Sequence, residues 1–244
     1  MTQRTNDTLG NPARDARFDV RLTWSDMVNL PRDHPEVNQE FLHRQMNEEI
    51  EGLEIAARNL VDFPEADWEL RMEIARQCAD EARHALAFRR LFEARGGVPG
   101  QYPVLNFQFK IITSLSSLLG RLAVANRSFE ASGLDAIGDG IASSSRRDDT
   151  EFTALFEQQL ADELQHVRYA NVWIKKFIDR DGGRAVMEIA RAMAHAETHF
   201  AAITGSGLTL YPISESLRRE AGFTDEEIQW AQTNAERLNH AAGS

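Results

Sequence analysis

The sequence lacks several features that define common classes of protein. It has one cysteine, Cys78, so no internal disulfide can form, and this is typical of a reducing compartment. The first twenty residues contain no apolar core of the kind that a signal peptide needs. The most apolar stretch, 109–125, is broken by Lys110 and Arg121 and falls short of the roughly 20 residues that span a bilayer. We therefore expect a cytoplasmic protein without a membrane segment.

Basic charge is also scarce. The 27 lysines and arginines stand against 38 aspartates and glutamates, which gives a formal net charge of -11. Such a balance repels phosphate backbones, so we expect no nucleic-acid partner. Hydrophobic residues make up 42% of the 244, an ordinary share for a globular chain that is long enough to bury a sizeable core.

Strand-like alternation is missing as well. Apolar residues recur at spacings of three and four over long windows, which predicts an all-α protein. We expect four long helices with an irregular or partly helical crossover before the fourth, followed by two more helices: 35–62, 66–95, 105–131, crossover 133–149, 150–180, 184–203 and 225–240. The expected domains are a polar leader, a four-helix bundle with a dinuclear metal site, and C-terminal helices that pack on the bundle or on a partner subunit: 1–32, 33–182 and 183–244.

Two segments, 79–84 and 161–166, share the pattern Ala-Asp-Glu-x-x-His. Residues three apart on a helix lie on one face, so a Glu and a His at this spacing can both reach one metal ion. The pattern alone is a weak signal, because composition gives about 0.6 such pairs by chance. A third pair, Glu40 and His43, does occur and is interpreted as a decoy.

Position on the helix separates two of these pairs from the third. Glu81 and His84 fall on a largely apolar stripe with alternating spacings of four and three, and so do Glu163 and His166. His43 lies one position off the corresponding stripe. Burying ionised carboxylates without partners costs several kcal/mol each, so a core that contains them needs compensating positive charge. Two divalent metal ions would supply it.

Two more carboxylates are needed to complete the ferritin-like template, which takes one Glu from each of the other two helices. Between Glu93 and Glu130 the chain has no acidic residue, so Glu130 is the third-helix candidate. In the first helix, Glu49 lies about 21 Å before the Phe-Pro turn and Glu81 about 25 Å after it. Glu54 is only about 14 Å from that turn. We predict Glu49 as the ligand, with Glu54 in reserve.

Other polar residues near the motifs have weaker assignments. Asp80 and Asp162 directly precede the motif glutamates and could orient the ligand histidines, although a solvated acid is an equal alternative. His199, four residues after His195, is a second reserve ligand, but surface histidines are the favoured interpretation. Cys78 is interpreted as a small core residue.

Two further stretches carry a family resemblance. Phe63-Pro64 followed by 80–84, together with the run 129–135, resemble a large and mostly uncharacterised bacterial family of ferritin-like domains. More broadly, 35–180 resembles the ferritin-like carboxylate-bridged di-iron proteins, and more distantly the tRNA-modifying di-iron monooxygenases. In those, a first-helix Glu precedes an aromatic-Pro turn at a distance like that of Glu49. The resemblance implies two iron ions, with manganese as an alternative, and activation of dioxygen.

The function implied is a di-iron oxygenase or oxidase that oxidises a small organic substrate by hydroxylation, desaturation, N-oxygenation or C-C cleavage. An electron donor such as a ferredoxin or reductase, and a homodimeric state, are compatible with it. The alternative is a ferroxidase, iron-storage or peroxide-scavenging protein, although no Cys-x-x-Cys pair supports a rubredoxin-type peroxidase. A metal-free helical interaction protein is the third class.

Overall fold

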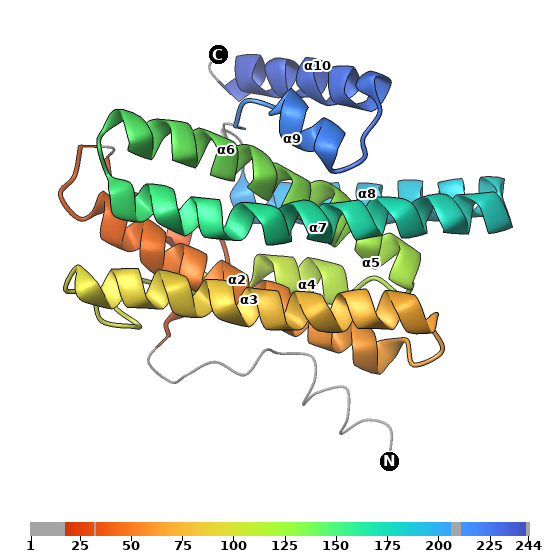
Figure 1. Cartoon of the computed structure of the whole chain (residues 1–244), viewed down its shortest axis with the longest axis horizontal. Helices are drawn as coiled ribbons and strands as arrows, with labels where there is room; N and C mark the ends of the chain where they lie inside the picture. The colour runs from red at the N-terminus through yellow and green to blue at the C-terminus, as the bar shows by residue number, and fades with distance from the viewer. Residues whose placement is uncertain (1–17, 32, 206–210, 243–244) are drawn as a thin grey trace. The chain divides into compact units, whose positions relative to one another are not determined.

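The computed structural model describes residues 18–31, 33–205 and 211–242, so most of the expected polar leader lies outside the described residues. The described chain is predominantly helical, which confirms the all-α prediction (Figure 1). It divides into two compact units, Met1–Ser116 and Ser117–Ser244. No helix in the described ranges combines the length and the apolar character needed to cross a membrane.

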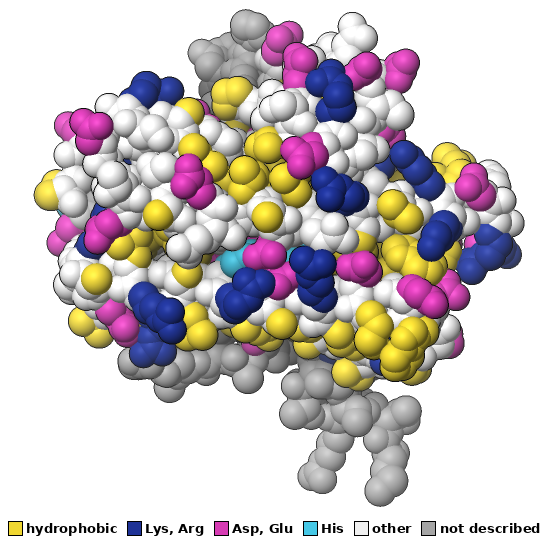
Figure 2. Space-filling view, in the orientation of Figure 1, with side chains coloured by type: hydrophobic (Ala, Val, Ile, Leu, Met, Phe, Trp, Pro, Cys, Tyr) yellow, Lys and Arg dark blue, Asp and Glu magenta, His cyan; other side chains and the backbone are white. Residues whose placement is uncertain are grey.

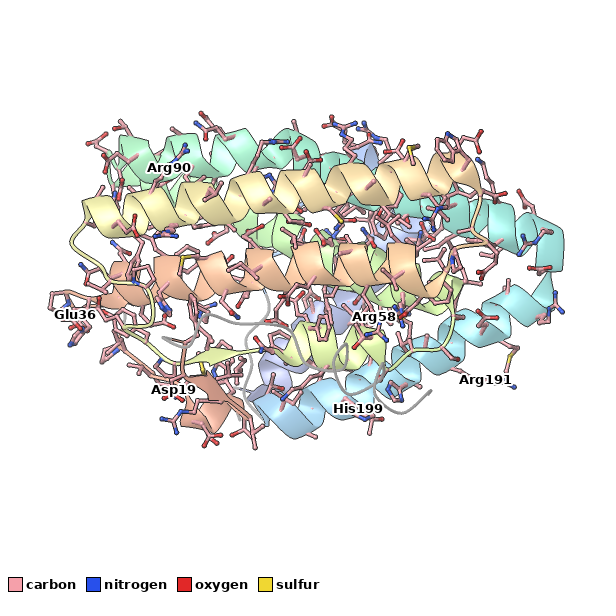
Figure 3. The ribbon with its side chains drawn as sticks, turned by 90° about the horizontal axis from the view of Figure 1, so that it is seen from below. Asp19, Glu36, Arg58, Arg90, Arg191 and His199 are labelled. Carbon is pink, nitrogen blue, oxygen red and sulfur yellow. The ribbon has the colours of Figure 1, made fainter. Side chains whose placement is uncertain are left out.

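Two long helices dominate the first unit. Helices α2 (Val37–Asp62) and α3 (Trp68–Ala94) lie side by side (Figures 1 and 3). The side chain of Arg71 donates to the carbonyl oxygens of Leu60 at 2.9 Å and of Phe63 at 3.0 Å, which satisfies carbonyls at the C-terminal end of α2. Helix α3 ends just before Gly96, which takes a φ of +84°. The expected helices 35–62 and 66–95 are confirmed to within two residues.

Short elements complete this unit. Strand β1 (Val20–Arg21) pairs in parallel with β2 (Val104–Leu105), the 3-10 helix η1 is Trp24–Asp26, and α4 is Phe107–Thr113. A core of large apolar side chains forms between these elements and the two long helices. Its buried members include Leu42, Met46, Leu70, Ile74, Phe88, Phe92, Val104, Phe109 and Ile112.

The second unit is helical over its described residues. Its elements are α5 (Leu118–Val124), the π-helix η2 (Ala125–Glu130), α6 (Ala131–Arg146), α7 (Thr150–Asp181), α8 (Gly183–Thr204), α9 (Glu215–Glu220) and α10 (Asp225–Ala242). Asp149 caps α7 by accepting from the backbone N–H of Phe152 at 3.2 Å. Thr224 and Glu227 form a capping box at the start of α10: the Thr224 N–H donates to Glu227 Oε2 at 2.8 Å, and the Glu227 N–H donates to Thr224 Oγ1 at 3.3 Å. The expected helices 150–180, 184–203 and 225–240 are confirmed.

The prediction of one continuous helix over 105–131 is wrong. Helix α4 ends at Thr113 and α5 begins at Leu118, because Ser117 caps a new helix by accepting from the N–H of Gly120 at 3.1 Å. The following turn is π-helical and ends at Glu130. The boundary between the two compact units falls in the same break.

The stretch 133–149, which was expected to be an irregular or partly helical crossover, is helical as far as Arg146. The stretch contains glycines, which have a low helix propensity, but neighbouring side chains pack into the space that they leave. A Cβ at Gly138 would approach the Leu217 side chain to 3.3 Å, and one at Gly140 would approach the Phe156 ring to 2.7 Å. These glycines therefore let α6 pack closely on its neighbours, and that packing outweighs their low helix propensity.

Candidate metal centre

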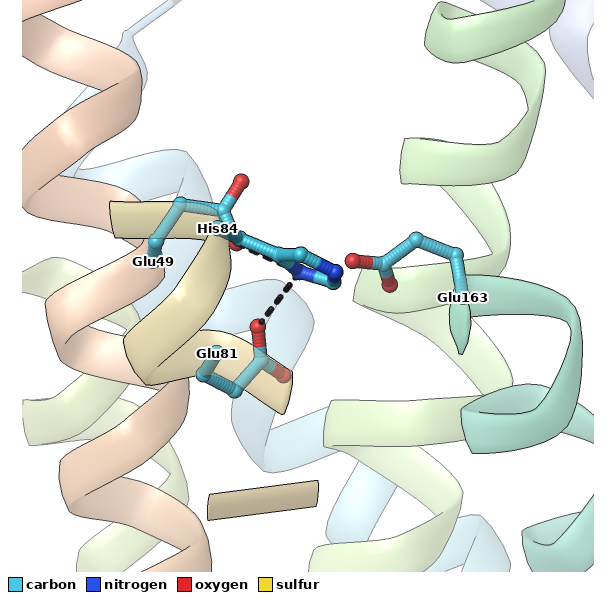
Figure 4. Close-up of side chains that lie close together, drawn as sticks. All are labelled: Glu49, Glu81, His84 and Glu163. Carbon is cyan, nitrogen blue, oxygen red and sulfur yellow. Dashed lines mark ion pairs between the residues drawn. The ribbon is translucent and has the colours of Figure 1, made fainter. Parts of the chain in front are cut away.

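The first unit holds three of the predicted ligands in one buried group. Glu81 and His84 lie one turn apart on α3, and Glu49 reaches them from α2 (Figure 4). His84 Nδ1 lies 3.4 Å from Glu49 Oε2 and 3.5 Å from Glu81 Oε2. The three side chains are between 3% and 12% exposed. We call this group the α3 half-site.

The second unit holds an equivalent trio, which we call the α7 half-site. Glu163 and His166 lie one turn apart on α7, and Glu130 is the last residue of η2. His166 Nδ1 lies 3.4 Å from Glu163 Oε2 and 3.7 Å from Glu130 Oε2. The Glu130 side chain is 17% exposed, which makes it the most open of the six.

The spacing within each half-site suits a metal ion better than a hydrogen bond. The separations of 3.4 to 3.7 Å between each histidine Nδ1 and the carboxylate oxygens exceed the usual 2.7–3.2 Å of an N–H···O bond. Donor atoms that bind one ion at about 2.1 Å lie roughly 3.0–3.4 Å apart. The observed separations lie at the upper end of this range or up to about 0.3 Å above it, so small side-chain shifts would bring the atoms to a common ion. Imidazole and carboxylate together suit first-row transition metals such as iron and manganese. The residues present therefore fit such an ion.

The stripes that carry these ligands are buried as the sequence pattern requires. On α3, the stripe is buried from Leu70 through Phe88, and Leu91 is partly exposed. On α7, every member is buried except the partly exposed Phe177. The buried members are Leu70, Ile74, Gln77, Glu81, His84 and Phe88 on α3, and Phe152, Phe156, Gln159, Glu163, His166, Ala170 and Trp173 on α7.

The π-helix η2 links Glu130 to α7. Asn126, in the same π-helical turn, donates from its side-chain amide to the carbonyl oxygen of His166 at 3.3 Å and to the hydroxyl oxygen of Tyr169 at 3.2 Å. Such π-helical turns are rare and occur frequently at functional sites. Nothing in the sequence pattern alone signalled this turn.

The structure places the remaining predicted residues as follows. Asp80 is buried and forms ion pairs with Arg76, at 3.5 Å, and with Arg83. Asp162 and Glu54 are half-buried, and neither belongs to a metal-ligating group among the described residues. His199 is exposed on α8, where its ring lies 4.1 Å from that of His195 between centroids.

The third Glu-x-x-His pair makes other contacts, although both of its side chains are buried despite their position off the predicted stripe. Glu40 pairs with Arg44 at 3.1 Å. His43 is fully buried, and its Nε2 accepts from the backbone N–H of Gly100 at 2.8 Å. Burial lowers the pKa of His43 to about 4, so the ring is neutral at physiological pH.

Two neighbours of the α3 half-site have structural roles. Burial, followed by the negative charge of Glu81, raises the pKa of the Cys78 thiol to about 11, so this sulfur stays protonated at neutral pH. Glu51, two residues after Glu49 on α2, is fully buried. Its Oε2 accepts from the backbone N–H of Phe109 at 2.9 Å, at the start of α4. Helical periodicity could not reveal this contact with a distant segment.

Comparison with known proteins finds one family. Residues 2–229 match the family described as Protein of unknown function (DUF455). No curated protein and no solved structure matches the chain. The chemistry of the site therefore rests on its own residues and geometry.

Proposed function

We propose a function for this chain, which belongs to the DUF455 family: it binds two metal ions, iron in the first instance, and oxidises a small organic molecule with dioxygen. The observation that carries the proposal is the presence of two matching Glu-Glu-His trios. One lies on α2 and α3, and the other lies on η2 and α7. In each trio the histidine Nδ1 lies within 3.7 Å of both carboxylates. The expected ferritin-like relationship supplies the reaction class.

We further propose that the two half-sites belong to a ferritin-like four-helix bundle over 33–182. Each half-site supplies one Glu-x-x-His and one Glu from the preceding helical segment, which is the ligand set of that template. Together they would contribute four carboxylates and two imidazoles. Two divalent cations would nearly neutralise the four carboxylates, which removes the cost of burying them.

Each residue has a defined task in this proposal. The ligands would be Glu49, Glu81, His84, Glu130, Glu163 and His166. Iron, when bound, supplies the electron-transfer and oxygen chemistry that side chains lack. The protein holds the ligand atoms in place and keeps water away through buried aromatic side chains on the same stripes, such as Phe88 and Trp173.

The charge of the chain bears on its partners. The net charge of -11 and the interspersed acidic and basic side chains on the face shown in Figure 2 favour a small organic substrate over a nucleic acid. Insertion of one oxygen atom from dioxygen consumes two electrons, so we propose an external reductant such as a ferredoxin or a reductase.

The first test is the metal content. The protein is loaded with ferrous iron without air, desalted, and assayed for bound iron. We expect two equivalents in the wild type and about one fewer in Glu130→Ala, because that variant removes a ligand of the α7 half-site. Glu157→Ala, which changes an exposed acid on the same half of the molecule, should retain both equivalents. Unchanged iron in Glu130→Ala would remove that residue from the ligand set.

The second test separates the reaction classes. Ferrous-loaded protein is mixed with ¹⁸O-labelled dioxygen, a chemical reductant and a panel of small organic molecules. Faster oxygen uptake with one compound, together with an oxidised product found by mass spectrometry, supports the oxygenase proposal. A cage-sized assembly that accumulates thousands of irons would indicate storage. Failure to bind iron or to consume oxygen would overturn the proposal.

A further inference from the structure

Gly52 occupies the middle of α2, one turn after Glu49, where a glycine weakens a helix relative to alanine. Its surroundings explain its presence. A Cβ at this position would lie 3.0 Å from Glu81 Cδ, 3.1 Å from Glu81 Oε1 and 3.4 Å from Glu81 Cγ. The first two distances are tighter than ordinary van der Waals contact. The Glu81 carboxylate therefore packs directly on the backbone of α2.

The same carboxylate oxygen is held from a second side. Gln77, one turn before Glu81 on α3, donates from Nε2 to Glu81 Oε1 at 2.9 Å, and both side chains are buried. The other oxygen, Oε2, is the one that lies 3.5 Å from His84 Nδ1. Oε1 is thus enclosed by Gly52 and Gln77, and Oε2 is the oxygen presented to the half-site.

The α7 half-site repeats the sequence pattern but not the close approach of the glycine to a ligand carboxylate. Gln159 precedes Glu163 by four residues, as Gln77 precedes Glu81, and Gly133 follows Glu130 by three, as Gly52 follows Glu49. At Gly133, however, a Cβ would have no described heavy atom within 4 Å. The turn before Gly133 is π-helical, whereas Gly52 lies in a continuous α-helix. The Glu163 carboxylate is therefore not enclosed by the glycine that corresponds to Gly52.

We infer that Gly52 and Gln77 are positioning residues that hold Glu81 in one orientation, with Oε2 presented to the metal and Oε1 withheld from it. The inference rests on the proposed function, since it assigns unequal roles to the two halves of that metal site. The α3 half-site has a preorganised ligand and binds its ion more tightly. The α7 half-site, with the more exposed Glu130, is the half whose carboxylates can rearrange.

The test uses Co²⁺ as a spectroscopic probe in the full-length protein. Wild type, Gly52→Ala, Gly133→Ala and Gln77→Leu are titrated anaerobically, and the visible absorption of bound Co²⁺ and the number of equivalents are recorded. The wild type should bind two equivalents with distinct affinities. Gly133→Ala is the matched glycine control and should bind both with an unchanged spectrum. Gly52→Ala and Gln77→Leu should bind the tighter equivalent at least about tenfold more weakly, with an altered spectrum.

A metal-independent measurement accompanies the titration. Alanine is the better helix former, so Gly133→Ala should raise the melting temperature of the metal-free protein. Gly52→Ala should lower it, because the new Cβ meets Glu81. The double variant Gly52→Ala/Glu81→Asp should recover thermal stability, since the shorter side chain clears the Cβ, without recovering the tight Co²⁺ site.

The outcomes are distinguishable. Wild-type Co²⁺ binding in both Gly52→Ala and Gln77→Leu would overturn the inference and leave the proposed function intact. If Gly52→Ala does not fold, Gln77→Leu decides the same question by its affinity and its spectrum. A wild type that binds no Co²⁺ and no Fe²⁺ would overturn the proposed function, and the inference with it.

Discussion

The surroundings of His43 show how the environment of one residue decides its chemistry. Its ring is packed between Phe92 and Tyr102, with centroid distances of 5.3 and 5.8 Å, and it accepts a backbone hydrogen bond from Gly100. These contacts leave it neutral and structural. His84 has the same sequence spacing from its glutamate but faces two carboxylates, as a ligand would.

The lowered pKa of His43 predicts a pH-dependent stability. Between about pH 6.5 and pH 4 the unfolded chain binds a proton at this ring and the folded chain does not. The free energy of unfolding should therefore fall as the pH is lowered through this window, by at most about 1.4 kcal/mol per pH unit from this group. Urea unfolding of the metal-free protein at a series of pH values measures the slope.

The control for this prediction is a pair of substitutions. His43→Gln, which keeps an acceptor for the Gly100 N–H, should show a shallower dependence on pH than the wild type. His199→Gln, which changes an exposed ring on α8, should retain the wild-type slope. Equal slopes in the wild type and His43→Gln would contradict the assignment of a neutral, buried His43.

At the scale of elements, buried ionic contacts attach the short helix α9 to α6. Asp135 accepts from Arg218 Nη2 at 2.5 Å and from the backbone N–H of Ser214 at 2.9 Å. Both side chains of the ion pair are at most 9% exposed. Leu217 packs over Gly138 of the same helix. The position of α9 on α6 thus depends on the buried ion pair between Arg218 and Asp135 and on the packing of the Leu217 side chain against Gly138.

Arg218→Met should be strongly destabilising. It leaves the Asp135 carboxylate buried without its cation, which typically costs about 3–5 kcal/mol. Arg219→Met is the matched control, because Arg219 pairs with Asp225 at 2.8 Å but both side chains are more than half exposed. That exposed pair should contribute at most about 1 kcal/mol. Urea unfolding of both variants decides between these values, and similar small losses would contradict the role given to the buried pair.

At the scale of the whole molecule, the six proposed ligands, which are buried or partly buried, would couple metal binding to folding. A metal ion that binds the folded chain alone stabilises it by about 2.7 kcal/mol at a concentration one hundred times its dissociation constant. Ferrous iron or Co²⁺ should therefore raise the melting temperature of the metal-free protein, and a chelator should reverse the shift. Ca²⁺, which prefers sites made only of oxygen ligands, is the control ion and should leave the temperature nearly unchanged.

This prediction also has a variant that separates the site from general ion effects. His84→Ala and His166→Ala each remove one imidazole and should each reduce the shift caused by Co²⁺. The same shift in the wild type and in both variants would place the bound ions elsewhere on the protein. Differential scanning calorimetry at fixed metal and protein concentrations makes the comparison.

The sequence by itself determined the helical class and the positions of the two Glu-x-x-His motifs on buried stripes. It could do so because both depend on residues three and four apart, which lie on one face of a helix whatever packs against it. The ends of α3 and α7 were predictable for a similar reason, since Gly96 and Gly182 adopt the positive φ values that glycine readily adopts.

Only the tertiary structure decided the contacts between distant segments. It placed Glu51 against the start of α4 and divided the expected third helix before Ser117. It also kept α6 helical through glycines whose small size lets neighbouring side chains pack closely. It also revealed that Gly52 faces Glu81, which makes the paired motifs unequal. Each of these depends on which surfaces meet in space, and that information is absent from the spacing of residues along one helix.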